Sequence, residues 1–71
     1  MPDMIFVESS YIEAIGYDLP ARELYVRLSD SGKTYVYSEV EEPVFEEFKS
    51  ADSKGTFLNT RIKNRYDFRK M

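Results

Sequence analysis

The stretch KTYVYSEV at residues 33–40 decides the fold. Its tyrosines stand at every second position, which is the period of a β-strand. A turn signal, Asp30-Ser31-Gly32, precedes it, and Glu41-Glu42-Pro43 follows as a helix start, because acidic residues and an early proline favour a helix N-terminus. The stretch therefore predicts a strand near the middle of the chain, with a hairpin partner before it and a helix after it.

The hairpin partner is predicted over residues 23–29, where Leu24, Val26 and Leu28 alternate with polar or aromatic residues. A three-residue turn that ends in a left-handed Gly32 would fix the register of the two strands. The resulting cross-strand pairs are Ser29 with Lys33, Arg27 with Tyr35, Val26 with Val36, and Tyr25 with Tyr37. This register predicts one aliphatic face and one face of tyrosines with an arginine.

The whole chain is predicted to be one α+β domain. A three-stranded antiparallel β-meander (about 10–17, 23–29 and 33–39) precedes two α-helices (about 43–51 and 53–66) packed on its aliphatic face. Ser53 is expected to cap the second helix, and Gly16 is expected to mark a bulge in the first strand. Residues 1–8 receive no assignment, 9–66 form the domain, and 67–71 form a tail expected to fray, although Phe68 could fold back. The predicted core is Ile12, Leu24, Val26, Leu28, Val36, Val40, Phe45, Phe48, Leu58 and Ile62.

The composition excludes several classes of function. The 71 residues include neither Cys nor His, so there is no disulfide, thiolate nucleophile, histidine-based triad or ordinary zinc site. We therefore expect no metal, no cofactor and no enzymatic activity. An acidic N-terminus and the lack of a long apolar run predict a cytoplasmic protein without a membrane segment. Eleven aromatic side chains are expected to stabilise the small core.

The charge is distributed unevenly along the chain. Residues 1–53 carry four basic against twelve acidic side chains, a balance of −8, whereas residues 54–71 carry six basic side chains against Asp67 alone, a balance of +5. The net charge of −3 argues against general nucleic-acid binding, but the basic C-terminal region could contact phosphates locally.

An ordered set of short motifs extends over residues 9–66. It consists of Ser9-Ser10, Gly16-Tyr17-Asp18, Leu24-x-Val26, Gly32-x-x-Tyr35-x-Tyr37, Val40-x-x-Pro43, and Ala51-x-Ser53-x-Gly55-x-Phe57-x-Asn59 with Ile62 and Tyr66. This set resembles the KTSC domain, a family named for the C-terminal domain of some lysyl-tRNA synthetases and found also as free-standing small bacterial proteins. Its central signature is a Tyr-x-Tyr pair, here Tyr35-Val36-Tyr37. The resemblance implies a binding module, with RNA as the expected ligand.

Two groups of residues are candidates for contacting that RNA. Tyr25, Arg27, Tyr35 and Tyr37 could form a platform on which unpaired bases stack, with the arginine adding a cation–π contact. The same rings could instead be structural, packed across strands or under the tail. The second group comprises the basic residues of the second helix, which could contact phosphates, remain solvated, or balance the acidic residues 39–47. Its members are Lys54, Arg61, Lys63 and Arg65. Arg69 and Lys70 of the tail could contact phosphates in the same way.

Ser53-Lys54-Gly55 at the start of that helix could also favour an anion. We interpret it as a plain N-cap, because the glycine spacing of a phosphate loop is absent. The sequence thus predicts a non-enzymatic module that binds tRNA or single-stranded RNA. The alternative is a protein–protein interaction module in which the tyrosines are structural, and the oligomeric state is left open.

Overall fold

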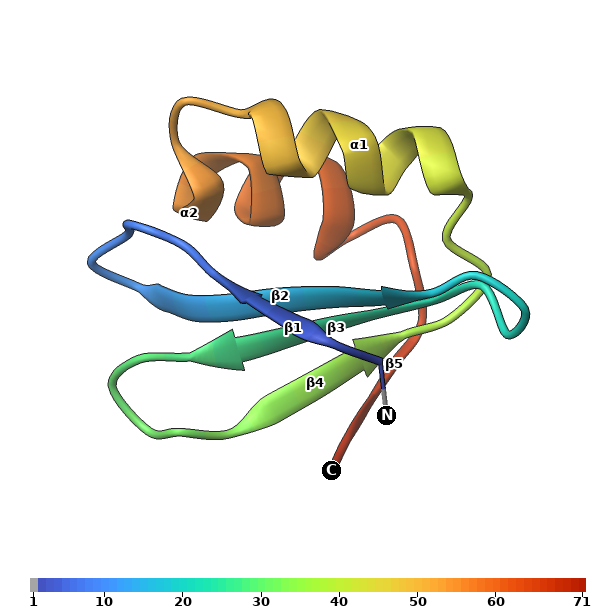
Figure 1. Cartoon of the computed structure of the whole chain (residues 1–71), viewed down its shortest axis with the longest axis horizontal. Coiled ribbons are helices and arrows are strands. Elements are labelled where there is room, and N and C mark those ends of the chain that lie inside the picture. The colour runs from blue at the N-terminus through green and yellow to red at the C-terminus, as the bar shows by residue number, and fades with distance from the viewer. Residues whose placement is uncertain (1) are drawn as a thin grey trace.

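The structure, a computed structural model, describes residues 2–71. Five antiparallel strands form one sheet in chain order, and the helices cover one side of it (Figure 1). No helix in the described part of the chain is long and apolar enough to cross a membrane. The strands are β1 (Met4–Phe6), β2 (Ile12–Asp18), β3 (Glu23–Leu28), β4 (Thr34–Tyr37) and β5 (Phe68–Lys70), and the helices are α1 (Glu42–Ser50), α2 (Lys54–Phe57) and the π-helical η1 (Leu58–Ile62) that continues α2.

The structure agrees with the predicted α+β class, with the predicted order of elements and with the position of the helices on one face. The sheet, however, has five strands rather than three. Part of the unassigned segment 1–8 forms β1, which pairs with β2. The segment 67–71, expected to fray, contains β5, which pairs with β4 and leaves the ring of Phe68 against Tyr35 and Tyr37. The second helix ends at Ile62 rather than at residue 66. Both added strands cover edges that would otherwise expose unpaired backbone groups.

The register predicted for β3 and β4 is wrong by one residue. The loop has four residues rather than three: the Gly32 N–H donates to the Leu28 carbonyl oxygen at 3.0 Å, and the Leu28 N–H donates to the Lys33 carbonyl oxygen at 2.9 Å. Gly32 has the expected positive φ, at 71°. Leu24 therefore lies opposite Tyr37, and Tyr25 opposite Val36. A slip of one residue moves every side chain of a strand to the other face.

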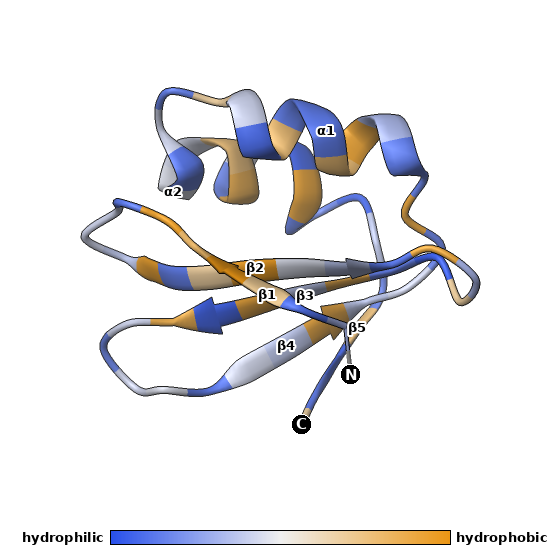
Figure 2. Ribbon diagram, viewed as in Figure 1, coloured by the Kyte–Doolittle hydropathy of each residue, from blue (hydrophilic) through white to orange (hydrophobic). Residues whose placement is uncertain are grey.

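The core lies between the helices and the sheet. All ten predicted core residues are buried, and nine belong to one apolar cluster; Val36 is buried on the opposite side of the sheet as a result of the register. Phe45 stacks on Tyr17 with ring centroids 5.2 Å apart, and Phe48 stacks on Phe57 at 5.1 Å. These stacks attach α1 to the sheet and to α2. Hydrophobic and hydrophilic residues alternate along α1 and the central strands (Figure 2).

Gly16 has a different role from the one predicted. The irregularity in β2 lies between Ile12 and Ala14, so the bulge is not at the glycine. Gly16 instead lies beneath the N-terminal segment: a Cβ atom there would be 2.7 Å from the Met4 sulfur and 2.9 Å from the Asp3 carbonyl oxygen. Only glycine lets β1 approach β2 this closely.

Ser53 caps α2 as predicted, because its hydroxyl oxygen accepts a hydrogen bond from the Thr56 N–H at 3.3 Å.

Candidate functional site

The structure divides the four residues of the predicted stacking platform between the two sides of the sheet. Residues directly opposite each other on antiparallel strands point to the same side. Tyr37 lies opposite Leu24 on the helix side, and Tyr35 points the same way two residues earlier. Tyr25 and Arg27 point to the side that no helix covers, which we call the open side. The expected common face of three tyrosines and one arginine is therefore wrong.

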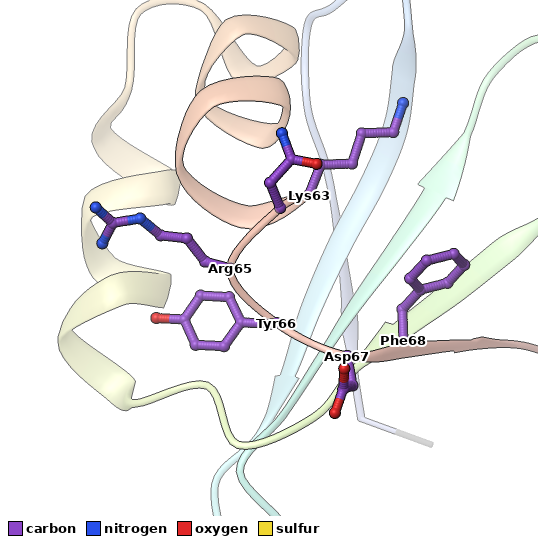
Figure 3. Close-up of a pocket in the computed structure, with 6 residues that line it drawn as sticks. Lys63, Arg65, Tyr66, Asp67 and Phe68 are labelled. Atoms are coloured by element: carbon purple, nitrogen blue, oxygen red, sulfur yellow. The ribbon is translucent and has the colours of Figure 1, made fainter.

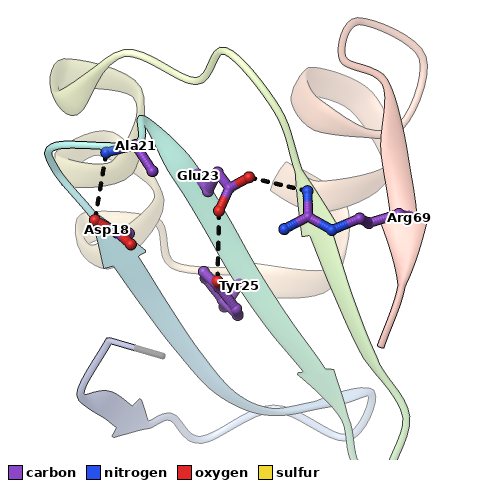
Figure 4. Close-up of polar contacts among 5 residues, drawn as sticks. All are labelled: Asp18, Ala21, Glu23, Tyr25 and Arg69. Atoms are coloured by element: carbon purple, nitrogen blue, oxygen red, sulfur yellow. Dashed lines mark hydrogen bonds and ion pairs between the residues drawn. The ribbon is translucent and has the colours of Figure 1, made fainter.

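On the open side the charged groups are paired with one another. Arg69 donates to one Glu23 carboxylate oxygen at 2.9 Å, and the Tyr25 hydroxyl donates to the other at 3.4 Å (Figure 4). The hydrogen bond from Arg69 holds the pKa of Glu23 below its usual value. Arg27 forms an ion pair with Glu13 at 3.3 Å. Tyr25 itself is only 7% exposed, so its ring has no free face for a base.

On the helix side the two tyrosines of the Tyr-x-Tyr signature differ in exposure. Tyr37 is 2% exposed and belongs to the core cluster. Tyr35 is half-buried, and the edge of its ring meets Phe68 with centroids 5.5 Å apart. Of this pair, only Tyr35 is placed to contact a ligand.

Burial of the tyrosines makes the stability of the protein depend on pH in the alkaline range. Desolvation raises the pKa of Tyr37, and it also raises the pKa of Tyr17 and Tyr25. Because the folded state then favours the neutral phenol, stability is retained below the ordinary tyrosine pKa of 10.0 and is lost as pH rises through the raised values. Urea denaturation at pH 8, 9.5 and 11 should show a falling midpoint only above about pH 10. Y37F should reduce that fall, and an equal fall in wild type and variant would contradict this explanation.

Two of the four predicted basic residues have partners inside the protein. The Lys54 ammonium donates to the Ala51 carbonyl oxygen at 2.6 Å. Arg61 forms an ion pair with Glu47 at 3.3 Å and lies 5.2 Å from the centre of the Phe57 ring. Lys63 and Arg65 take no part in the ion pairs found among residues 2–71. The acid-balancing interpretation thus fits Arg61, whereas Lys63 and Arg65 keep their charges available.

A cleft of about 500 Å³ lies where the chain leaves η1 and enters β5. The side chains of Lys63 and Phe68 lie on one side of this connection, whereas Arg65 and Tyr66 lie on the other and Asp67 points away from the Phe68 ring (Figure 3). Phe68 is 55% exposed. The cleft is lined by Lys63, Asn64, Arg65, Tyr66, Asp67 and Phe68.

The sequence did not point to Phe68 as a site residue, and it gave Lys70 only as one of several basic residues that could contact phosphates. The place of both residues depends on β5. Lys70 lies opposite Tyr35, and Phe68 lies opposite Tyr37, so both point to the helix side. The basic segment and the tyrosine strand, predicted separately, therefore meet along β4 and β5. We call Tyr35, Lys63, Phe68 and Lys70 the β4–β5 surface.

Comparison with known proteins assigns this chain to a family. The sequence model of the KTSC domain matches residues 8–66. The chain belongs to the KTSC domain family. A protein of Tsukamurella paurometabola is 45% identical to this KTSC domain over 60 residues, covering 84% of this chain and 88% of that relative.

The crystal structure of a KTSC domain protein from Yersinia pestis superposes on this KTSC domain with a TM-score of 0.94 at 38% sequence identity. The superposition covers 100% of this chain and 99% of the other. It therefore includes β1 and β5, which lie outside the residues matched by the family model.

Proposed function

We propose that this KTSC domain is a non-enzymatic RNA-binding module that holds single-stranded RNA, or an unpaired loop of a tRNA, on the β4–β5 surface. The observation that carries the proposal is the half-exposed ring of Phe68 beside two lysines that form no ion pair among the described residues. A cytoplasmic location, where such RNA is abundant, belongs to the same proposal.

Base stacking accounts for part of the expected affinity. A base on the exposed part of Phe68 would also meet Tyr35, whose ring stands edge-on to Phe68 at 5.5 Å. Stacking on an aromatic side chain contributes roughly 1–3 kcal/mol per base and tolerates any base identity. This mode needs unpaired bases, which favours single strands over duplex RNA.

The distribution of charge explains why RNA is expected at the β4–β5 surface and not elsewhere on the protein. The protein is acidic overall, so RNA should approach only where cations are unpaired. Arg27 and Arg69 on the open side are neutralised by carboxylates, whereas Lys63 and Lys70 are not. The β4–β5 surface therefore combines the exposed ring of Phe68 and the half-buried ring of Tyr35 with positive charge that is unpaired among residues 2–71.

Fluorescence anisotropy tests this function directly. A labelled ten-nucleotide RNA without secondary structure should bind at low salt and dissociate as salt rises. Each phosphate neutralised on a single strand contributes a slope of about −0.7 in a plot of log K against log salt, so two lysines predict a slope of about −1.4. A duplex of the same length should bind more weakly. K49A, which removes an exposed lysine of α1 outside this surface, should bind the single strand as tightly as the wild-type protein does. No binding to the single strand at the lowest salt would refute the proposal.

A second candidate function is docking of a protein partner along β1. This strand is at the edge of the sheet, and its Ile5 and Phe6 side chains are 45% and 73% exposed. Exposed backbone groups on an edge strand can pair with a strand from another chain. The buried rings of Tyr25 and Tyr37 fit this alternative. If RNA does not bind, substitution of Phe6 and a search for protein partners should follow.

A further inference from the structure

A second cleft, of about 510 Å³, lies between the loop before β2 and the start of α2. It shares Lys63 with the cleft described above, so the two clefts adjoin along that side chain. Five of its residues belong to the motifs that mark the family resemblance, and the proposed stacking surface does not use them. They are Ser9, Ser10, Ser53, Gly55 and Asn59. The cleft is lined by Ser9, Ser10, Tyr11, Ser53, Gly55, Thr56, Asn59 and Lys63.

Two hydroxyl groups in this cleft, those of Ser9 and Thr56, retain a proton for a ligand. The Ser9 oxygen accepts from the N–H groups of Tyr11 and Ile12 at 3.2 and 3.3 Å, which leaves its own proton free to be donated. The Ser53 hydroxyl donates to the Thr56 hydroxyl oxygen at 2.9 Å, so the Thr56 proton can be donated outward. These bonds also hold the two hydroxyl oxygens in place.

The remaining polar groups point to an anionic ligand. Asn59 adds an amide with two N–H donors, and Lys63 adds an ammonium group. None of the residues that line the cleft is a carboxylate. A lining rich in donors, with one cation and no acid, matches the acceptor oxygens of a phosphate.

We propose that this cleft binds a phosphate group. The inference rests on the proposed function, because it assigns one phosphate of the bound RNA to this cleft while the bases lie on the β4–β5 surface. The phosphate could be a backbone diester or a terminal monoester, which present the same oxygens. Lys63 contributes to both sites, so a substitution there does not distinguish them.

Gly55 allows a specific test. Its φ is not positive, and a Cβ atom built on it would lie 3.9 Å from the nearest atoms of Tyr11, an ordinary contact. G55A should therefore fold normally, and G55V should place further methyl groups in the cleft. N59A removes the amide group from an exposed position. T60A, at a neighbouring exposed residue that does not line the cleft, is its control.

The experiment is an NMR titration with inorganic phosphate at constant ionic strength, with chloride as the reference anion. Saturable shifts are expected at the amides of residues 9–11 and 53–59. They should be abolished by G55V, weakened several-fold by N59A and unchanged by T60A. If G55V fails to fold, N59A against T60A decides the outcome. Shifts equal to those in chloride, or unaffected by both cleft variants, would overturn the inference.

RNA titrations separate this inference from the proposed function. A 5′-phosphorylated oligonucleotide that binds several-fold more tightly than its 5′-hydroxyl form, with the difference lost in G55V, indicates a terminal monoester. Equal affinity for both forms, lowered several-fold by G55V, indicates a backbone diester. RNA binding that is unaffected by G55V and N59A would overturn the assignment of an RNA phosphate to this cleft and retain the β4–β5 surface. Phosphate binding without RNA binding would refute the RNA function alone.

Discussion

Replacing Tyr37 with alanine is expected to destabilise the protein by about 3–5 kcal/mol, the usual result of removing a large buried ring. Tyr37 is 2% exposed, belongs to the core cluster, and lies against Phe68 with ring centroids 5.6 Å apart. At about 0.05–0.15 kcal/mol per residue, a chain of this length has only roughly 4–10 kcal/mol of stability in total. Y37A should therefore be partly or fully unfolded at 37 °C.

Urea denaturation followed by circular dichroism measures this effect at neutral pH. Y37F is the control, because it keeps the ring and removes only a hydroxyl that forms no hydrogen bond among the described residues. We expect Y37F to change the free energy of unfolding by less than about 1 kcal/mol. A loss of less than about 1 kcal/mol in Y37A would mean that the ring lies outside the core and that the sheet has a different register.

Reversing the charge of Lys63 and Lys70 together is expected to abolish RNA binding while the protein stays folded. Two unit charges about 4 Å apart interact by about 1 kcal/mol in water, so each reversal should change the binding free energy by roughly 2 kcal/mol at low salt. Together the two reversals should cost about 4 kcal/mol, so the K63E/K70E variant should lose roughly 1000-fold in affinity. Both side chains are exposed and form no ion pair among residues 2–71, so the denaturation midpoint should change little.

The control for this double variant is K33E/K49E, which changes the net charge by the same amount at two other exposed lysines. Anisotropy titrations of both variants separate a local contact from the effect of total charge. An equal loss of affinity in the two variants would contradict a specific role for the β4–β5 surface.

The sequence predicts the central part of this fold well because the signals there are strong and local. The alternation in residues 23–28, the proline at the start of α1 and the spacing of Leu58 and Ile62 each place an element within a few residues of its observed position. The same patterns identify every residue of the predicted core as buried. Amphipathic periodicity is sufficient here because the apolar side of each element is buried.

The outer strands and the register depend on contacts that no local pattern encodes. β1 and β5 have three residues each, too short for a period, and they form because the edges of β2 and β4 are available. The register depends on one residue of loop length, since both three-residue and four-residue hairpin loops can end in a left-handed glycine. That single residue decides which side of the sheet Tyr35 and Tyr37 occupy.

The candidate site was only partly predictable for the same reason. Lys63 could be identified from the charge pattern, but its proximity to Phe68 and to the strand of Tyr35 depends on the return of the chain along β4. The cleft that joins Ser9 to Asn59 brings together residues 50 positions apart, and no spacing in the sequence indicates that contact.

The most direct test of the central claim is an NMR titration of labelled protein with a short single-stranded RNA at low and moderate salt. We expect shifts at Tyr35, Lys63, Phe68 and Lys70 that decrease as salt rises, with Arg27 on the open side unaffected. Shifts confined to the open side or to β1, or no shifts at low salt, would contradict RNA binding at the β4–β5 surface.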